Sequence, residues 1–497
     1  MGFISGKTRF FNRRLAIAVS LIALSSFNYG FDNQAFATTQ AMDAFDKRFG
    51  EYDPIKKTYY LPSTWLALFN SLNYIGFAAG VIIGSFVSAR WGRRMCMFVM
   101  SIYAIGTATI AVTSTNKHHV MAARVLNYIY VGMELAVVPA YQSEIVPAPL
   151  ALILGGLVIN CVCLGTSTLS GDESWRIPLG LFHVIPVIIS TCIWFLPESP
   201  RWLLSKGRVD EARASLTQYR SGSFTEEEID KEFRETQVQL ELASERGRFL
   251  DIFASKNLKR TFLVVGINFF QQATGQQFAS QYGGIYVKQL GTINPFVFTL
   301  LVAVVNATAI AISLLTNDNK IGRRKPLLLS ATIMCTALMI MGALGTQDVI
   351  SKSTKIAIVS MLCFMTFGFS LGLAPLTYVV ATEIPALGLR DATLRLGFCV
   401  NVLFNFVSNF ILPYLLAALG SKTGFVFGSV AFLGVLFIYF CIPECKGKTL
   451  EQVDRMFQEG VPLRKFGDFA AEDLGSTAQK DEDDAVVAQI EVGREKQ

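Results

Sequence analysis

The stretch GSFVSARWGRR, residues 84–94, closes an apolar run with a cluster of arginines, and its last three residues recur as GRR at 322–324. Two further pairs follow in the same order: EIVP at 144 and EIP at 383, then PESPR at 197 and PECKG at 443. The copies of each pair are separated by about 230 to 250 residues. Three pairs in register indicate that the chain consists of two similar halves.

The composition places these halves in a membrane. The chain is 52% hydrophobic and 16% charged, with a mean hydropathy of +0.42, values that a soluble domain seldom combines. Twelve apolar runs reach the roughly 20 residues that cross a bilayer. They lie near 15–37, 64–88, 95–114, 119–141, 149–167, 177–196, 261–289, 294–316, 326–346, 355–381, 394–418 and 422–442. We therefore predict an all-α membrane protein with twelve transmembrane helices in two pseudo-symmetric six-helix bundles, the arrangement of a secondary transporter.

The polar segments define the predicted domains. These are a cytoplasmic N-terminus at 1–14, a six-helix bundle at 15–196, an intracellular helical domain at 197–260, a second bundle at 261–442, and a C-terminal helix with a disordered tail at 443–497. In the intracellular domain, Thr225 and Glu228 have the spacing of a capping box, and Ile229, Phe233 and Val238 form a thin apolar stripe. We expect two to four short helices there.

Basic residues occur mainly on one side of the alternating spans. They precede the first run, follow the second and the eighth, and fill the segment between the sixth and the seventh, as at Arg14, Arg93, Lys320 and Arg260. The positive-inside rule then places both termini in the cytoplasm. This placement explains the net charge of +6 without any nucleic-acid partner.

The chain contains no recognisable catalytic set. It has three histidines, no phosphate-binding loop and no nucleophile motif. Its nine cysteines lie within or beside apolar runs without paired spacing, which is typical of small core residues rather than disulfides or metal ligands. We expect no enzyme activity, no cofactor and no metal.

Seven motifs together identify a family. They are GSFVSARWGRR, VPAYQSEIVP, WRIPLGL, PESPRWLL, FFQQATGQQF, TNDNKIGRRKP and PECKGKTLEQVDRMF. Over roughly residues 12–457 the chain resembles a sugar porter of the major facilitator superfamily, of the fungal type. The resemblance implies a multi-pass plasma-membrane protein that is functional as a monomer. It would take up a mono- or disaccharide together with a proton by alternating access.

One acid and one arginine lie inside the predicted spans at matching depth. Asp32 is about five residues from the outer end of the first span, and Arg124 is about five residues from the outer end of the fourth. Pairing would offset the cost of burying both charges. The resemblance implies that Asp32 carries the coupled proton, whereas a permanent structural pair is the alternative. Glu134, a second acid of the fourth span, is either a proton relay or a structural group.

A sugar site needs amides and an aromatic ring rather than charges. The seventh span offers Gln271, Gln272 and Gln277, with Gly275 weakening the helix between them. Interhelical hydrogen bonding is the structural alternative for these glutamines. The resemblance places these three side chains on the substrate positions and adds three more: Asn306, Tyr378, where the family usually has Trp, and Asn401.

The resemblance also implies a cytoplasmic gating network. Its members would be Arg93, Arg94, Glu144, Glu198, Arg323, Arg324, Glu383 and Glu444. The acid that the family carries in the loop before each GRR is replaced by Ala89 in the first copy and by Asn319 in the second. This gate would therefore be looser than in the family.

The two halves differ at the fifth span. From Pro385 to Pro443 there are 58 residues, but from Pro147 to Pro197 there are only 50. The fifth span is therefore predicted as a truncated helix of about 27 Å from Pro149 to about Thr166. Either the chain is a true variant, or the sequence lacks an exon edge. Four functions stay open on this basis: a proton-coupled importer, a non-transporting sugar sensor, a passive facilitator, and a defective copy.

Overall fold

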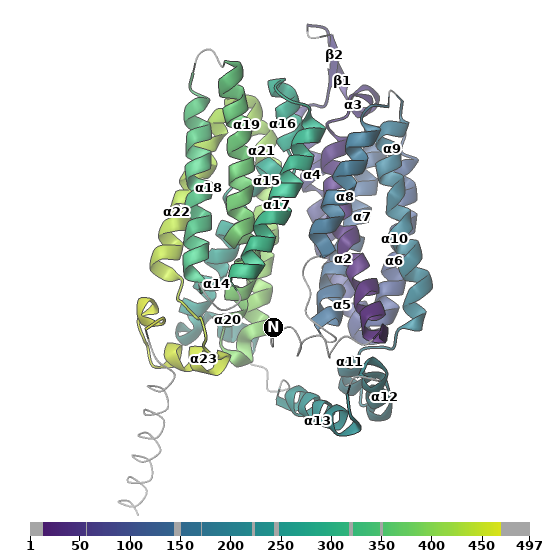
Figure 1. Cartoon of the computed structure of the whole chain (residues 1–497), viewed down its shortest axis with the longest axis vertical. Coiled ribbons are helices and arrows are strands. Elements are labelled where there is room, and N and C mark those ends of the chain that lie inside the picture. The colour runs from purple at the N-terminus through teal and green to yellow at the C-terminus, as the bar shows by residue number, and fades with distance from the viewer. Residues whose placement is uncertain are drawn as a thin grey trace, which may run out of the picture.

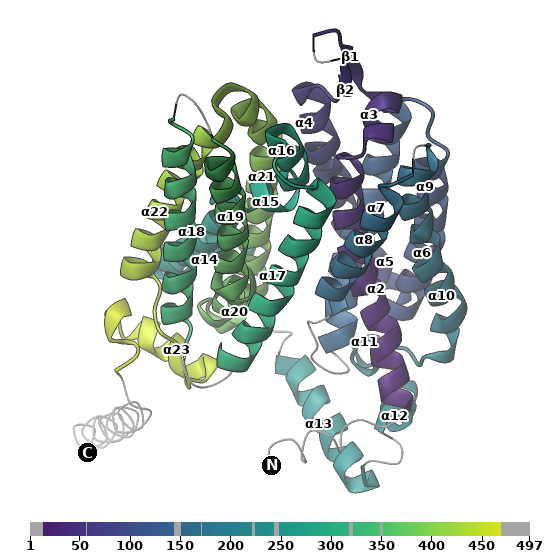
Figure 2. The same cartoon turned by 45° about the horizontal axis from the view of Figure 1, so that its top comes forward.

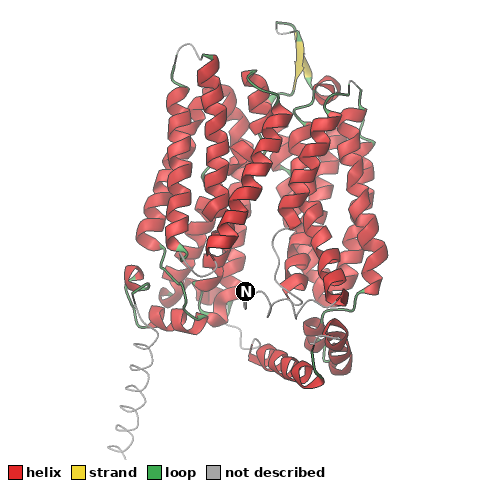
Figure 3. Ribbon diagram, viewed as in Figure 1, coloured by secondary structure: helices red, strands yellow, loops and turns green. Residues whose placement is uncertain are grey.

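The structure, a computed structural model, describes residues 13–468 apart from 56, 144–150, 170, 221–223, 243–247, 318–321 and 348–350. Each predicted span corresponds to a helix or to a stack of consecutive helices (Figure 3). The first six are α2 (Arg13–Thr39), α4 and α5 (Ser63–Ser71 and Asn73–Trp91), α6 (Arg93–Val112), α7 (Lys117–Ser143), α8 (Ala151–Thr166), and α9 and α10 (Glu173–Gly180 and Val184–Cys192). The last six are α14 to α16 (Ser255–Ala273, Gln276–Ser280 and Gly283–Leu290), α17 (Pro295–Asn317), α18 (Arg324–Leu344), α19 and α20 (Lys352–Gly368 and Ala374–Glu383), α21 (Arg390–Leu419) and α22 (Thr423–Cys441).

The all-helical membrane class is confirmed. Within the described residues, 8 continuous helical segments are long and apolar enough to cross a membrane, and one of them, Arg390–Cys441, contains both α21 and α22. Helices suit these runs because lipid offers no partners, so each backbone N–H and C=O must be bonded within its own segment. The total of twelve crossings stays a prediction.

The helices form two groups that stand side by side (Figure 1). Helices α2 to α10 make up the N-terminal half, and α14 to α22 make up the C-terminal half. At one end of the molecule lie helix α3 (Asp43–Phe49) and the antiparallel strands β1 (Glu51–Asp53) and β2 (Thr58–Tyr60). We call this end the hairpin end.

The opposite end carries three helices that lie between the two halves in the sequence: α11 (Pro200–Ser205), α12 (Val209–Arg220) and α13 (Glu226–Leu242). We call it the basic end. The predicted capping box is present, since the Thr225 N–H donates to Glu228 and the Glu228 N–H donates to the Thr225 hydroxyl. Ile229 and Phe233 are buried as predicted, in a cluster with side chains of α11 and α12. Val238 does not belong to this cluster and is 54% exposed.

The basic end also holds α23 (Leu450–Gln458), capped by Thr449 and Gln452. Beyond it the chain folds back, and Phe466 is fully buried against Met456 and Phe457. The chain therefore keeps a defined structure over residues 458–468, within the segment for which a helix with a disordered tail is predicted. The remainder of the predicted tail lies outside the described residues.

Helix α8 is short, as predicted. It has 16 residues, or about 24 Å at 1.5 Å per residue. It packs along α2, where the Thr38 hydroxyl donates to Asn160 at 2.9 Å, and its Ile159 and Cys163 are fully buried. The shortened helix therefore forms a regular part of the N-terminal half.

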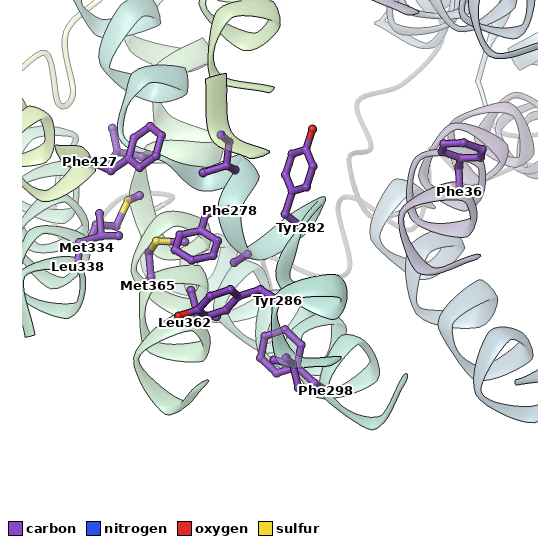
Figure 4. Packing of buried hydrophobic residues seen from close by; sticks show 14 of the residues in the cluster. Phe36, Phe278, Tyr282, Tyr286, Phe298, Met334, Leu338, Leu362, Met365 and Phe427 are labelled. Atoms are coloured by element: carbon purple, nitrogen blue, oxygen red, sulfur yellow. The ribbon is translucent and has the colours of Figure 1, made fainter. Parts of the chain in front are cut away.

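The seventh predicted span is broken rather than continuous. Gly275 adopts a φ of +84°, in the left-handed region, and separates α14 from α15. Beyond the break, Phe278 and Tyr286 pack in a buried cluster with Phe298, Leu362 and Met365 (Figure 4). This cluster fixes α15 and α16 against α17 and α19.

Candidate transport site

A cavity of about 730 Å³ lies between the two halves. The N-terminal half contributes Val81, Ser85, Leu135 and Ala136, and the C-terminal half contributes Asn268, Tyr378, Ala381, Asp391, Leu394, Arg395, Phe398 and Cys399. The lining residues of α5 and α7 lie toward the basic end, and those of α21 belong to its first three turns, which also start there. The cavity is therefore reached from the basic end.

At the hairpin end the halves are in contact. The Tyr74 hydroxyl donates to Asn405 at 2.9 Å, and the Gln281 amide donates to Asn33 at 2.6 Å. Helix α4 lies against α21, which closes this end of the molecule (Figure 2). The structure is thus open at one end only.

A cluster of ion pairs also joins the halves at the hairpin end. We call the line of contact between the halves at this end the closed seam. The Lys288 ammonium on α16 lies 2.6 Å from Asp46 and 2.8 Å from Asp43, both on α3. Asp46 is buried, whereas the Asp43 side chain is 95% exposed. We call these three residues the hairpin-end latch, because they join the two halves across the seam.

Four of the six predicted sugar-binding side chains form one hydrogen-bonded network. The Asn401 amide donates to Gln271 at 2.6 Å, and Gln272 donates to Asn401 at 3.2 Å. Gln277 donates to Gln272 at 3.4 Å. All four side chains are at least nine-tenths buried. We call them the amide network.

The other two do not belong to the amide network. Tyr378 lines the cavity with a half-exposed ring, and its hydroxyl lies beside Gln271. Asn306 on α17 instead accepts a hydrogen bond from Ser370, in the π-turn between α19 and α20, at 2.5 Å. The structure therefore brings five predicted residues together and separates Asn306 from them.

Two asparagines that were not predicted belong to the same region. Asn405 accepts from Gln277 at 2.7 Å as well as from Tyr74, and Asn268 lines the cavity beside Asn401. The signal was present in the sequence, because positions 401, 405 and 409 of α21 are all asparagine at the four-residue spacing of one helix face. Asn409 donates to Asn405 at 2.8 Å and continues this row.

Asp32 and Arg124 both line a small cavity in the N-terminal half. The cavity measures about 20 Å³, enough for one water molecule, and is otherwise lined mainly by apolar side chains such as Phe36 and Trp175. No ion pair within 4 Å joins the two charges, although both are at most 5% exposed. Arg124 instead places its guanidinium 3.9 Å from the centre of the Phe36 ring.

The repeated motifs form the same arrangement in both halves: a carboxylate that accepts hydrogen bonds from backbone N–H groups at the start of a helix. We call this arrangement a carboxylate cradle. The Arg93 N–H donates to Glu198 at 2.9 Å, and the Arg323 N–H donates to Glu444 at 2.8 Å. The Arg94 and Arg324 N–H groups donate to the same two carboxylates. Each acid therefore sits at the N-terminus of a helix, where backbone amides and the helix dipole favour an anion.

A glycine precedes each cradle because a side chain would not fit. Gly92 and Gly322 have φ values of +99° and +89°, and a Cβ at either position would overlap the carboxylate of Glu198 or Glu444. The predicted gating residue Glu383 lies 3.3 Å from Arg323. Glu144, the remaining predicted member, lies outside the described residues, as does Asn319.

Comparisons with known proteins agree with this architecture. A family model described as "Sugar (and other) transporter" matches residues 18–457. The chain is 28% identical over 475 residues to hexose transporter HXT8 of Saccharomyces cerevisiae, covering 90% of this chain and 82% of the relative. It is 26% identical over 489 residues to the high-affinity glucose transporter ght2 of Schizosaccharomyces pombe, covering 94% and 91%.

Solved structures share the fold. The proton:xylose symporter XylE, a major facilitator superfamily protein bound to 6-bromo-6-deoxy-D-glucose, superposes with a TM-score of 0.71 at 21% identity, covering 90% of this chain and 100% of that one. An inward-open conformation of XylE from E. coli gives 0.72 at 19% identity, covering 89% and 99%. Since the family model spans most of the chain and the relatives are membrane transporters rather than enzymes, the protein belongs to the sugar transporter family of the major facilitator fold.

Proposed function

We propose that the protein is a plasma-membrane symporter that carries a sugar into the cell together with a proton. The observation that carries this proposal is the buried amide network beside a cavity that is reached from one end only. Such a cavity suits alternating access, in which the two ends of the cavity open and close in turn around a bound solute. The hexose, glucose and xylose named for the relatives support a sugar as that solute.

The amide network can exchange partners with a sugar. Gln271, Gln272, Gln277 and Asn401 now satisfy one another, so sugar hydroxyls would replace bonds of similar strength rather than fill unpaired groups. Tyr378 would present its ring to the apolar face of the sugar from the cavity side. Asn306 would act only through the π-turn that it anchors.

Asp32 would carry the proton. A buried charge in a membrane protein needs a partner, and the separation of Asp32 from Arg124 argues against a permanent ion pair. If Arg124 approaches Asp32 when the halves rearrange, the carboxylate is stabilised and its proton is released. If Arg124 withdraws, Asp32 binds a proton again. The two charges would thus couple proton binding to the alternation of the halves.

The basic end would face the cytoplasm. Arg93, Arg94, Arg323 and Arg324 all lie there, and the positive-inside rule places such clusters on the cytoplasmic side. Both termini would then be cytoplasmic, and the structure would represent an inward-facing state.

Uptake into transporter-deleted cells tests the proposal. Labelled hexoses, pentoses and disaccharides would be offered at pH 5 and pH 8 to cells with the natural chain or with Asp32→Asn. We expect acid-stimulated uptake of at least one sugar, lost in Asp32→Asn while the protein still reaches the surface. Equal uptake at both pH values in both chains would instead indicate a passive facilitator.

A third chain separates the remaining alternatives. It would restore about a dozen family-like residues after Leu150, ahead of the short helix α8. Transport by this chain alone would identify the present sequence as a defective copy. Sugar binding without transport in every chain would favour a sensor.

A further inference from the structure

Asp32 is cut off from the cavity through which its proton would have to leave. Its own small cavity is lined toward the hairpin end by Val120 and Trp175, whereas the large cavity opens at the basic end. Neither Asp32 nor Arg124 lines the large cavity. An inward release step therefore needs a second proton-binding group between the two cavities.

A row of buried polar side chains connects them. Asp32, Asn28 and Ser25 follow one another on α2 at helical spacing and are at most 3% exposed. The Asn28 amide donates to the Tyr130 hydroxyl on α7 at 3.0 Å. Seven residues of helix place Ser25 about 10 Å closer to the basic end than Asp32.

Glu134 on α7 stands at the inner end of this row. It is 3% exposed, and the hydroxyls of Ser25 and Tyr130 lie beside it without hydrogen-bond geometry to either carboxylate oxygen. The next two residues of the helix, Leu135 and Ala136, line the large cavity. Glu134 is therefore adjacent along the chain to two residues of the cavity wall.

The groups that the structure describes around Glu134 supply no positive charge that would stabilise its carboxylate. The titratable groups that face it are Tyr29 and Asp32 on α2 and Tyr130 on its own helix, with Tyr378 of α20 next to Tyr29. Within the described residues, no lysine, arginine or histidine lies close enough to pair with it. An unpaired carboxylate inside a membrane protein binds a proton in preference to staying charged.

We propose that Glu134 is a second proton-binding residue, which receives the proton of Asp32 and passes it to the large cavity. In the first step the Asp32 carboxyl loses its proton and the Glu134 carboxylate gains one, through the polar row between them. In the second step Glu134 releases this proton to water in the cavity. The inference rests on the proposed proton symport and adds the route by which the proton leaves.

Purified full-length protein in liposomes tests the relay. Glu134→Gln keeps the shape of the protonated acid but cannot release a proton, and Glu134→Asp keeps the acid at a shorter reach. Sugar exchange between equal pools needs no net proton release, whereas uptake driven by a pH gradient does. We expect Glu134→Gln to retain exchange with an unchanged KM while gradient-driven accumulation falls at least tenfold. Glu134→Asp should restore accumulation with a shifted dependence on internal pH.

Ser101→Ala serves as the matched control, because Ser101 is a buried polar residue of the same half that bonds only within its own helix. Accumulation by Glu134→Gln equal to that of the natural chain, with the same dependence on internal pH, would overturn the relay. If Glu134→Gln does not fold, an unshifted internal-pH profile in Glu134→Asp overturns it instead. Failure of the natural chain to accumulate sugar under a pH gradient would refute the symport itself, and the relay with it.

Discussion

Asn405 is the residue at which the amide network meets the other half of the molecule. Its side-chain oxygen accepts from Gln277 at 2.7 Å and from Tyr74 at 2.9 Å. The first partner belongs to the amide network and the second to the N-terminal half. If Gln277 binds the sugar as we propose, Asn405 would connect that contact to the closed hairpin end.

Replacing Asn405 with alanine would remove the acceptor of the Tyr74 hydroxyl and the shorter of the two hydrogen bonds that the Gln277 amide donates, at a partly buried site. Such a loss costs about 1–3 kcal/mol. Since 1.4 kcal/mol corresponds to a factor of ten, we expect kcat/KM for sugar uptake to fall about five- to hundredfold. Thr308→Ala is the control, because the Thr308 hydroxyl is exposed and bonds only to its own helix. Unchanged uptake in Asn405→Ala would show that this contact carries no coupling.

Gly275 provides a second test at the level of one residue. With φ at +84°, alanine there would strain the backbone by about 1–2 kcal/mol, and its Cβ would lie 2.7 Å from the Phe427 ring. We expect Gly275→Ala to lower the thermal unfolding temperature in detergent and to raise the KM for sugar. Gly106→Ala should be neutral or stabilising, because nothing lies within 4 Å of its Cβ position in the middle of α6. Equal unfolding temperatures for the two variants would contradict this account of the break.

The sequence predicts some of the residues of the candidate site and misses others. The glutamines and Gly275 were found because several amides beside one glycine are unusual in an apolar run. Asn405 could have been found from the four-residue spacing of asparagines in α21. By contrast, the separation of Asp32 and Arg124 by a small cavity was not predictable, because matching depth in two helices does not determine which rotamers their side chains adopt.

At the scale of elements, α3 and α16 hold the hairpin end together through the latch. Burial raises the pKa of Asp46 above its usual value, and the ammonium of Lys288 offsets part of this rise. When the seam opens, Asp46 enters water and its pKa returns to the usual value. The closed seam therefore binds this proton more tightly than the open one, and a lower external pH favours closure.

This sign gives a measurable pH dependence. Between the usual pKa of an aspartate and the raised one, the closed population should increase as the external pH falls, and Asp46→Asn should abolish that change. The distance between spin labels on α3 and α16 reports the seam in a cysteine-free background. An increase in the open population at low pH, depending on Asp46, would contradict the assignment. Asp172→Asn is the control, because Asp172 pairs with Arg176 within its own half and takes no part in the latch.

Elements were predicted more reliably than their contacts. The apolar runs yield helices because membrane helices satisfy their own backbone, and the shortened α8 follows from the missing residues between the repeated prolines. The exposure of Val238 and the ordered chain at 458–468 were not predicted. Both depend on whether another part of the folded chain packs against these residues, which a local sequence pattern does not specify.

At the scale of the whole molecule, the repeats predict two equivalent halves, and the equivalent cradles around Glu198 and Glu444 reflect this symmetry. The repeats cannot predict which end is closed. That depends on contacts such as Tyr74 with Asn405, whose partners lie 331 residues apart and share no sequence pattern. The halves also differ in their charges. The predicted spans of the N-terminal half contain the acids Asp32 and Glu134, whereas those of the C-terminal half contain no acid and one arginine, Arg395.

In the proposed mechanism, the C-terminal half recognises the sugar and the N-terminal half binds the proton. The cavity between the halves provides the connection, because both must rearrange around it for either solute to pass.

The most direct test is to follow internal pH while sugar enters liposomes that contain the purified protein and a trapped pH-sensitive dye, with no initial pH gradient. The account predicts that sugar moving inward acidifies the interior, and that Asp32→Asn abolishes the acidification while sugar exchange continues. Sugar entry with no change in internal pH would contradict the proposal that the protein moves a proton with each sugar.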